Sequence, residues 1–264
     1  VYGAMLNAVT GVPLRSNRMA RFTHPEGFPD PAALFEVQIK AAKGETVTVG
    51  NGKVDYEKWV DHQPSGASVL HKKGDKMITS LGDDLVEEMN FILEEQYAKP
   101  FAEQGIDFRK QTVFMEILVG VDDDPEKTWE RIETTRKAFE DYYGEDRPAG
   151  LIYPVSWIPN MDSIIEPQPR VVSGNAEIVR SGNIENGFST WTNIRHQGVN
   201  EVMVSAVSGD DASNILNTID ERIKEAGGQG LREDGVFNNA YVVANTDSQA
   251  SRDSLGKFNA SFSA

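Results

Sequence analysis

The chain lacks cysteine entirely, although it is 264 residues long. Disulfide bonds, cysteine nucleophiles and thiolate metal sites are therefore excluded, and stability must come from packing or from association. Long apolar runs are also missing, so no segment reaches the ~18 residues that a membrane-spanning helix needs. The first residues carry no basic stretch ahead of an apolar core, and they do not read as a secretory signal. We expect a chain with no membrane partner.

Positive charge is scarce, because 26 lysines and arginines face 41 acidic residues and give a formal net charge of −15. This balance argues against binding of nucleic acid, which requires a basic surface. Two explanations of the acidity remain open. The acids can form an ordinary solvated surface, or they can line a pore wall that repels a passing polyanion. The second explanation applies only to a protein that assembles into a ring.

Motifs for catalysis and for metal or nucleotide binding are missing as well. A His-Glu-x-x-His zinc motif, a Gly-x-Ser-x-Gly elbow and a phosphate-binding glycine loop are all absent. The four histidines are scattered through predicted loops; they are His24, His62, His71 and His196. His62 and His71 can meet across a hairpin, but surface positions are the expectation. We assign no catalytic, cofactor-binding or metal residue and expect no cofactor, and the pattern favours a protein that is not an enzyme.

The chain divides into four segments that differ in their pattern of apolar and polar residues. Residues 1–33 hold four prolines at a density that blocks regular strand ladders, which predicts an extended arm. Between these prolines lie Arg15, Arg18 and Arg21, the only locally basic spot in the sequence. This spot can dock an acidic neighbour, or it can lie solvated on the arm.

Residues 34–110 are predicted to combine a β-hairpin region with an acidic helix. Alternation of apolar and polar residues, interrupted by a Gly-Asn-Gly turn, predicts a hairpin or meander over residues 34–60. Apolar residues at helical spacing predict a helix over residues 82–98, which Pro100 ends. We expect its acidic residues on solvated faces; they are Asp83, Asp84, Glu87, Glu88, Glu94 and Glu95.

Residues 111–167 are predicted to form a strand–helix–strand unit. The alternation over 113–121 predicts a strand with one buried face. Asp124 before Pro125 predicts a capped helix start rather than a calcium loop, because the glycine and the closing glutamate of such a loop are missing. The expected buried stripe of this helix runs through Trp129, Ile132, Arg136 and Phe139. A strand over 151–157 closes the unit.

Residues 168–264 follow the same order of elements. After a hairpin come a strand over 201–207, a helix over 210–226 that ends at a glycine-rich break, and a strand over 241–244. Three of the four helix positions that align at one offset are apolar in both units. The match indicates either a duplication or convergent use of one packing solution.

These patterns together predict an α+β fold with two layers. Amphipathic helices should cover one face of antiparallel or mixed sheets, because each helix must bury its apolar stripe against a second element. The two strand–helix–strand units would form the scaffold, and the N-terminal arm would extend from it.

The order of elements over residues 169–264 resembles the tail-terminator and tail-completion proteins of tailed viruses. Pro169 opens a strand, Trp191 precedes a long strand, Asp210 and Asp211 stand at the start of the helix, and a strand over 258–262 comes last. The resemblance is confined to this range, and the preceding 168 residues have no counterpart in the compact members of that family.

Members of this family are small α+β subunits that form a ring closing the tail tube. The resemblance implies a non-enzymatic virion protein, assembled in the host cytoplasm, that forms an oligomeric ring or shell component at the tail or the head–tail junction. Its partners would be copies of itself and neighbouring virion proteins, without sequence-specific binding of nucleic acid. Arm 1–33 and hairpin 34–60 would contact neighbours, and adjacent subunits would cover the sheet edges.

The alternative is a soluble cytoplasmic enzyme or ligand-binding protein with a site between two ferredoxin-like halves. Its candidate residues are chosen by polarity and aromatic content alone; they are Tyr153, Trp157, Trp191, Arg195 and His196. Particle symmetry or size in solution separates the two hypotheses, since only the first requires assembly.

Overall fold

The computed structural model describes residues 47–50, 55–62, 68–74, 85–155, 164–173, 176–196, 199–207, 214–231 and 253, the first three ranges by backbone alone. Within them, one mixed eight-stranded sheet has the order β1-β2-β3-β6-β4-β5-β9-β8, and a small antiparallel sheet has the order β11-β10-β7. The large sheet comprises β1 (Val47–Gly50), β2 (Asp55–His62), β3 (Ser68–Gly74), β4 (Thr112–Gly120), β5 (Ala149–Val155), β6 (Ile165–Ser173), β8 (Ile184–Glu185) and β9 (Phe188–Ser189). The small sheet comprises β7 (Glu177–Arg180), β10 (Trp191–His196) and β11 (Val199–Val204).

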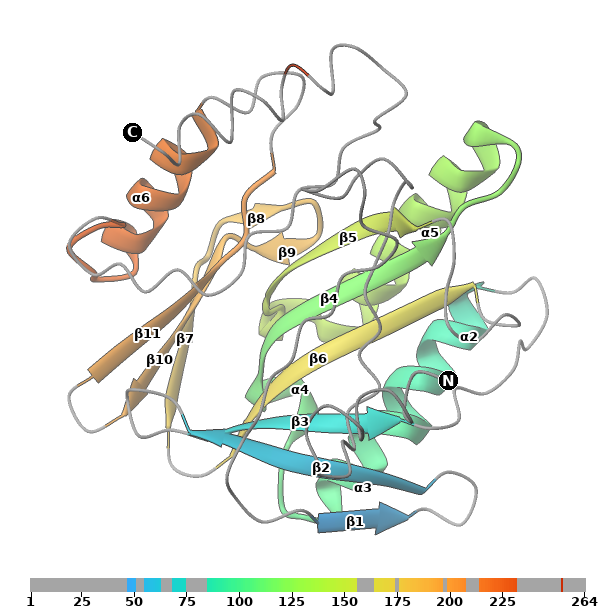
Figure 1. Cartoon of the computed structure of the whole chain (residues 1–264), viewed down its shortest axis with the longest axis horizontal. Helices are drawn as coiled ribbons and strands as arrows, with labels where there is room; N and C mark the ends of the chain where they lie inside the picture. The colour runs from blue at the N-terminus through green and yellow to red at the C-terminus, as the bar shows by residue number, and fades with distance from the viewer. Residues whose placement is uncertain are drawn as a thin grey trace, which may run out of the picture.

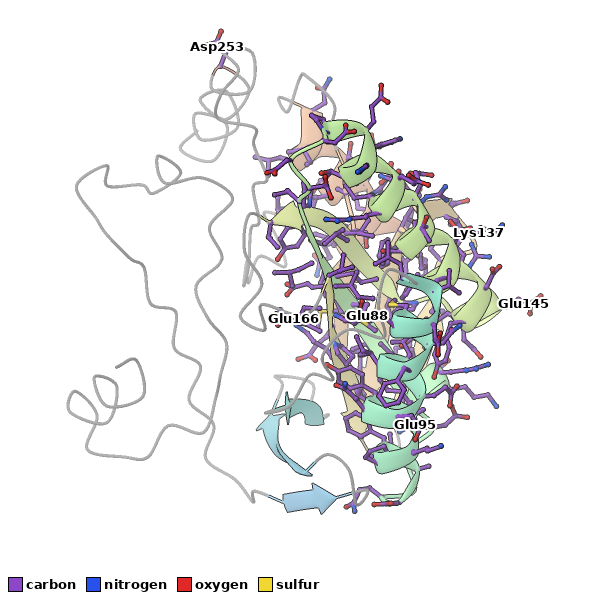
Figure 2. All side chains as sticks on the ribbon, turned by 90° about the vertical axis from the view of Figure 1, so that its right-hand side faces the viewer. Glu88, Glu95, Lys137, Glu145, Glu166 and Asp253 are labelled. Atoms are coloured by element: carbon purple, nitrogen blue, oxygen red, sulfur yellow. The ribbon has the colours of Figure 1, made fainter. Side chains whose placement is uncertain are left out.

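Helices cover one face of the large sheet, as Figures 1 and 2 show. They are α2 (Leu85–Phe91), the π-helix η1 (Ile92–Ala98), α3 (Lys99–Ala102), α4 (Phe108–Gln111), α5 (Pro125–Tyr143) and the 3-10 turn η2 (Gly144–Asp146), while α6 (Ile215–Glu225) contacts β11 of the small sheet. The predicted α+β class is confirmed. The predicted arm 1–33 and the strand expected at its end lie outside the described residues.

The predicted unit over residues 111–167 is confirmed as β4, α5 and β5, with β4 and β5 parallel. Asp124 caps α5, because its carboxylate accepts the backbone N–H of Glu126 at 2.9 Å, and Pro125 stands in the first turn. Asp122, which lies just before this helix start, forms a salt bridge with Arg131 at 2.6 Å. The acidic turn is therefore a helix start rather than an ion site.

Strand β4 corrects the prediction of a single buried face, because eight of its nine residues are buried. It lies between β5 and β6, and apolar clusters form on both of its sides. Met115 and Ile117 pack under the helices, whereas Val113 packs with Val172 and Ile194 on the other side. A register shift between positions 112 and 114 accounts for the displaced Val113, since a bulge reverses the alternation of side chains.

The acidic helix does not end at Pro100 as predicted. It continues through η1 and α3 to Ala102, and the backbone N–H of Lys99 bonds to the carbonyl of Glu94 five residues earlier. A proline inside an α-helix clashes with the carbonyl four residues before it. The π-helical turns directly ahead of Pro100 replace that geometry, so the helical path continues past the proline.

Glu88 was expected on a solvated face, but its side chain is buried, with 2% of its surface exposed. Its carboxylate lies within 3.3 Å of the backbone N–H of Ile164, just before β6. Figure 2 shows the contrast with Glu95, Lys137 and Glu145, which lie at the outer side of the helical layer. Helical periodicity alone does not predict the burial of Glu88, because its carboxylate accepts a hydrogen bond from the backbone N–H of Ile164, just before β6.

Trp129 was expected in the buried stripe of α5, yet 63% of its surface is exposed. Phe139 is buried as predicted, and the other buried residues of the helix include Thr135 and Tyr142. Thr135 can occupy a core position because its hydroxyl donates to the carbonyl of Arg131 at 2.7 Å, which leaves no polar atom unsatisfied there. A buried threonine is therefore part of the core-facing side of α5, although the apolar pattern of the sequence does not mark it.

The second unit is confirmed in part, because β11 and α6 are present and Gly227 ends α6 with a φ of 95°. The strands expected over 241–244 and 258–262 lie outside the described residues, so the duplication stays a prediction. The predicted boundary between residues 167 and 168 falls within β6, whose neighbours β3 and β4 come from the two preceding segments. All three predicted segments after the arm therefore contribute strands to one sheet.

Two hydroxyl groups join the small sheet to the large one. Thr192 of β10 accepts the backbone N–H of Ala149 at 2.9 Å, and Ser205, just after β11, accepts that of Gly150. The side chain of Asn193 donates to the carbonyl of Ala226 at 2.6 Å and so ties the end of α6 to β10. These buried bonds hold the small sheet and α6 against β5.

Candidate functional site

The described residues proposed for a ligand site lie on two strands, β5 and β10. Tyr153 is buried in an apolar cluster on β5, and Trp191 begins β10. Arg195 lies four residues further along β10, about 13 Å away at the usual rise per residue, and pairs with Glu177 at 3.7 Å. His196 ends this strand, and Trp157 lies outside the described residues. A pocket between two halves is not supported by these positions.

The histidines likewise do not form a site in the described part of the chain. His71 of β3 lies opposite Trp59, and His62 of β2 lies opposite Ser68, so the two histidines are not paired across this hairpin. No group of three or more histidine, aspartate or glutamate residues suited to a metal occurs among the described residues. In the same ranges, no helix is both long and apolar enough to cross a membrane.

The β1-β2-β3 meander is attached to the rest of the sheet by a short stretch of pairing. Strands β2 and β3 pair with each other over seven positions, but β3 pairs with β6 only from Ser68 to Leu70. The remaining half of β3, together with β2 and β1, diverges from the sheet, as the lower part of Figure 1 shows. The described part of the predicted hairpin is confirmed as the antiparallel pair β1 and β2. Both strands extend away from the rest of the sheet (Figure 1).

Two prolines explain why β3 leaves β6. If the pairing continued, Lys72 and Gly74 would face Pro169 and Pro167, which have no N–H to donate. Both prolines pair with β4 on their other side, and the carbonyl of Pro167 accepts a hydrogen bond from the Tyr97 hydroxyl at 2.8 Å. This edge of β6 is therefore closed to β3, as edge prolines close a strand to further pairing.

A groove of about 430 Å³ lies in the helical layer. It is formed by η1, α3, α4, the turn before α4 and the last part of α5, and it is lined by Glu94, Ala98, Ala102, Gly105, Ile106, Asp107, Phe108, Arg109 and Tyr142. Phe108 and Ile106 are buried, so the groove has an apolar floor beneath charged residues. We call this site the helix-layer groove.

The charged residues of the helix-layer groove are held in fixed positions. Arg109 donates to Glu94 at 3.0 Å, and its guanidinium lies over the ring of Tyr142, 4.1 Å from the ring centre. Asp107 caps α4 by accepting the backbone N–H of Lys110. Burial raises the pKa of Tyr142 to about 12, so its hydroxyl is uncharged at neutral pH. The groove thus combines an apolar floor with a rim whose carboxylates outnumber its one cation.

Sequence reasoning missed this groove because its lining comes from four elements. Glu94 and Arg109 are fifteen residues apart, and Tyr142 belongs to a different helix. One signal was present, since Pro100 inside a helical pattern indicates either an end or an irregular turn. The π-helix that carries Glu94 is that irregular turn, and π-helical turns are frequent at functional sites.

Alkaline pH tests the buried hydroxyl of Tyr142. Its pKa is about 12 in the folded chain and close to 10 in the unfolded chain, so the folded state keeps the proton longer. Stability from this group is fully present below pH 10 and is lost as pH rises toward 12, by on the order of 2 kcal/mol. Urea unfolding between about pH 9 and about pH 11.5 should therefore show a steeper loss for the wild type than for Tyr142→Phe. Equal losses in the two proteins would contradict the assignment.

Comparison with known proteins assigns no family to the chain. No protein-family model matches the chain, and a search of curated proteins gives no match. Function must therefore be inferred from the sequence pattern, the fold and the projecting meander.

Proposed function

We propose that this chain is a non-enzymatic structural subunit of a tailed virus, which forms an oligomeric ring or shell component at the tail or the head–tail junction. Its partners in this proposal are copies of itself and neighbouring virion proteins, and it uses no cofactor. The resemblance of residues 169–264 to tail-terminator proteins supports the class of protein. The projecting β1-β2-β3 meander is the structural observation that supports assembly.

The meander supports assembly because its described backbone pairs with the body of its own subunit over a short stretch. Isolated hairpins have marginal stability in water, and this one is anchored through three residue pairs to β6. Strand β1 also lies at the edge of the described sheet, where unpaired backbone groups are open to another chain. A neighbouring subunit that packs on the meander would stabilise it and cover this edge.

The acidity of the chain agrees with this function. A net charge of −15 gives a ring an acidic wall, and DNA that passes through such a ring is repelled rather than bound. A ring also removes exposed sheet edges by placing each edge beside the next subunit. The alternative is a ligand-binding function, whose described candidate residues lie on β5 and β10.

The prolines of β6 give a direct test of the proposal. In the double variant Pro167→Val/Pro169→Val the edge of β6 gains two N–H donors, and we expect β3 to pair along its whole length. The meander should then fold onto its own subunit, and self-association should weaken about tenfold or more, which corresponds to ~1.4 kcal/mol. Light scattering coupled to size-exclusion chromatography measures the change.

A matched control is available in β5. Pro154 also stands in a strand of the large sheet, but it pairs with Val119 and is remote from β3. The variant Pro154→Val should assemble like the wild type. A wild-type chain that stays monomeric at every concentration would refute the proposed function, and a double variant that assembles normally would remove the role of the meander.

A further inference from the structure

The first 25 residues differ in charge from the rest of the chain. They contain Arg15, Arg18 and Arg21 and no acidic residue, whereas all 41 acids follow them. Apolar residues stand among the arginines, namely Val12, Leu14, Met19 and Phe22. Residues 11–24 thus form a segment that is both cationic and partly apolar, and we call it the basic segment.

The helix-layer groove has the complementary chemistry. Its floor includes Phe108, Ile106 and the ring of Tyr142, and all three residues are at least 90% buried. At its rim Glu94 and Asp107 have half-exposed side chains, and exposed Glu103 stands between the lining residues Ala102 and Gly105. An apolar floor under an acidic rim suits a peptide that presents arginines between apolar side chains.

Arg109 does not cancel this complementarity. Its guanidinium bonds to Glu94 and covers the face of Tyr142, so the cation is already engaged in the wall of the groove. An incoming arginine can use the outer oxygen of Glu94 and the carboxylate of Glu103, because a carboxylate accepts from more than one donor. The rim then has the carboxylates of Glu94, Glu103 and Asp107 against the cations of Arg109 and Lys110, the second of which pairs with Asp107 at 3.7 Å.

The chain between the basic segment and β1 is long enough to connect two subunits. An extended chain spans up to about 3.3–3.6 Å per residue, so the residues between the basic segment and β1 can bridge on the order of 70 Å. A small domain is about 30 Å across. The segment can therefore leave its own subunit and reach the next one.

We propose that the helix-layer groove of one subunit binds the basic segment, residues 11–24, of a neighbouring copy. This inference rests on the proposed function, since it names the contact that links adjacent subunits of the ring or shell. The apolar residues of the segment cover the floor of the groove, and its arginines pair with the rim carboxylates. The arm then acts as a strap between subunits, separate from the contact made by the β1-β2-β3 meander.

Charge reversal in the full chain tests this contact. We expect Arg15→Glu/Arg18→Glu/Arg21→Glu to weaken self-association about tenfold or more in sedimentation velocity at low salt, and Glu94→Arg/Glu103→Arg to do the same. Combining both sets should restore association, because each reversed partner then meets its complement. The control Glu126→Arg/Glu130→Arg, at exposed positions of α5, should leave association unchanged. Circular dichroism should confirm that all variants keep their helices.

The outcomes separate this inference from the proposed function. Loss of association in each single set, followed by rescue in the combined chain and with the control unaffected, supports the strap. Association that survives both reversals, or that fails to recover in the combined chain, overturns the strap and leaves assembly through the meander standing. A wild-type chain that is monomeric at every concentration overturns both, including the case in which the segment fills the groove of its own subunit.

Discussion

Replacing Gly150 by alanine is expected to lower the free energy of unfolding by about 3 kcal/mol or more, because the added methyl group has no room. An ideal Cβ at this position would lie 2.2 Å from the carbonyl oxygen of Met115 and 2.6 Å from the ring of Phe188. The first contact is with the backbone of the neighbouring strand β4, which cannot rotate away as a side chain can. The second is with a ring that is itself fully buried.

The position is sensitive for a second reason. The N–H of Gly150 donates to the hydroxyl of Ser205, so a shift of β5 away from β4 would also disturb the bond that holds the small sheet. We therefore expect Gly150→Ala to loosen both sheets, with a loss of cooperativity in urea unfolding. Melting of the variant should begin at lower temperature, and insoluble protein is the expected result of expression at elevated temperature.

Gly182 provides the matched control. A Cβ at Gly182 would meet no atom within 4 Å, and its backbone does not adopt the left-handed conformation. Gly182→Ala should change stability by less than about 1 kcal/mol, and the reduced entropy of the unfolded chain favours a small gain. If the two alanine variants unfold at the same urea concentration, the close approach of β4 and β5 is refuted.

Phe139→Ala is the second change with a large expected effect, a loss of about 3–5 kcal/mol. Phe139 is fully buried, and its ring lies 4.6 Å from that of Phe188 and 4.7 Å from that of Tyr143. It therefore joins α5 to the sheet and to the short hairpin of β8 and β9. Truncation leaves a cavity at the centre of the helical layer, where the surrounding strands and helices can relax only in part.

Trp129→Ala, on the same helix, controls for the size of the side chain that is removed. Trp129 is larger than Phe139 but 63% exposed, so its removal should cost less than about 0.5 kcal/mol. Urea unfolding at neutral pH measures both variants. Equal destabilisation by the two changes would place Trp129 in the core and contradict the structure. A loss of assembly without a loss of stability in Trp129→Ala would instead mark Trp129 as a contact between subunits.

The parts of the fold that the sequence predicts are those whose signals are local. The cap by Asp124, the start at Pro125 and the end of α6 at Gly227 each depend on a few neighbouring residues. The turn between β8 and β9 is likewise local, because Asn186 and Gly187 both adopt positive φ angles, which this residue pair favours. Local rules suffice here because the backbone groups involved are satisfied within one or two turns of chain.

The errors arise where a tertiary contact overrides a local rule. Glu88 is buried because it serves a backbone group near β6, and Pro100 stays within a helical path because η1 precedes it. Val113 faces the side of the sheet opposite to Met115 because of a bulge between positions 112 and 114. The alternation of apolar and polar residues in the sequence does not show this bulge. The helix-layer groove was missed for the same reason, since its residues come together only when η1, α4 and α5 pack.

The divergence of β3 also has a consequence for the order of folding. Strands β2 and β3 are neighbours in sequence, so they can pair within microseconds, whereas β6 follows β4, α5 and β5 in the chain and its long-range contact with β3 is expected to form more slowly. A partly folded chain would therefore carry a formed hairpin before its β4–α5–β5 body is complete. In the proposed assembly a neighbouring subunit would capture this hairpin, which pairs with β6 over three positions among the described residues. Subunit addition would then be limited in rate by folding of the β4–α5–β5 body rather than by encounter between subunits.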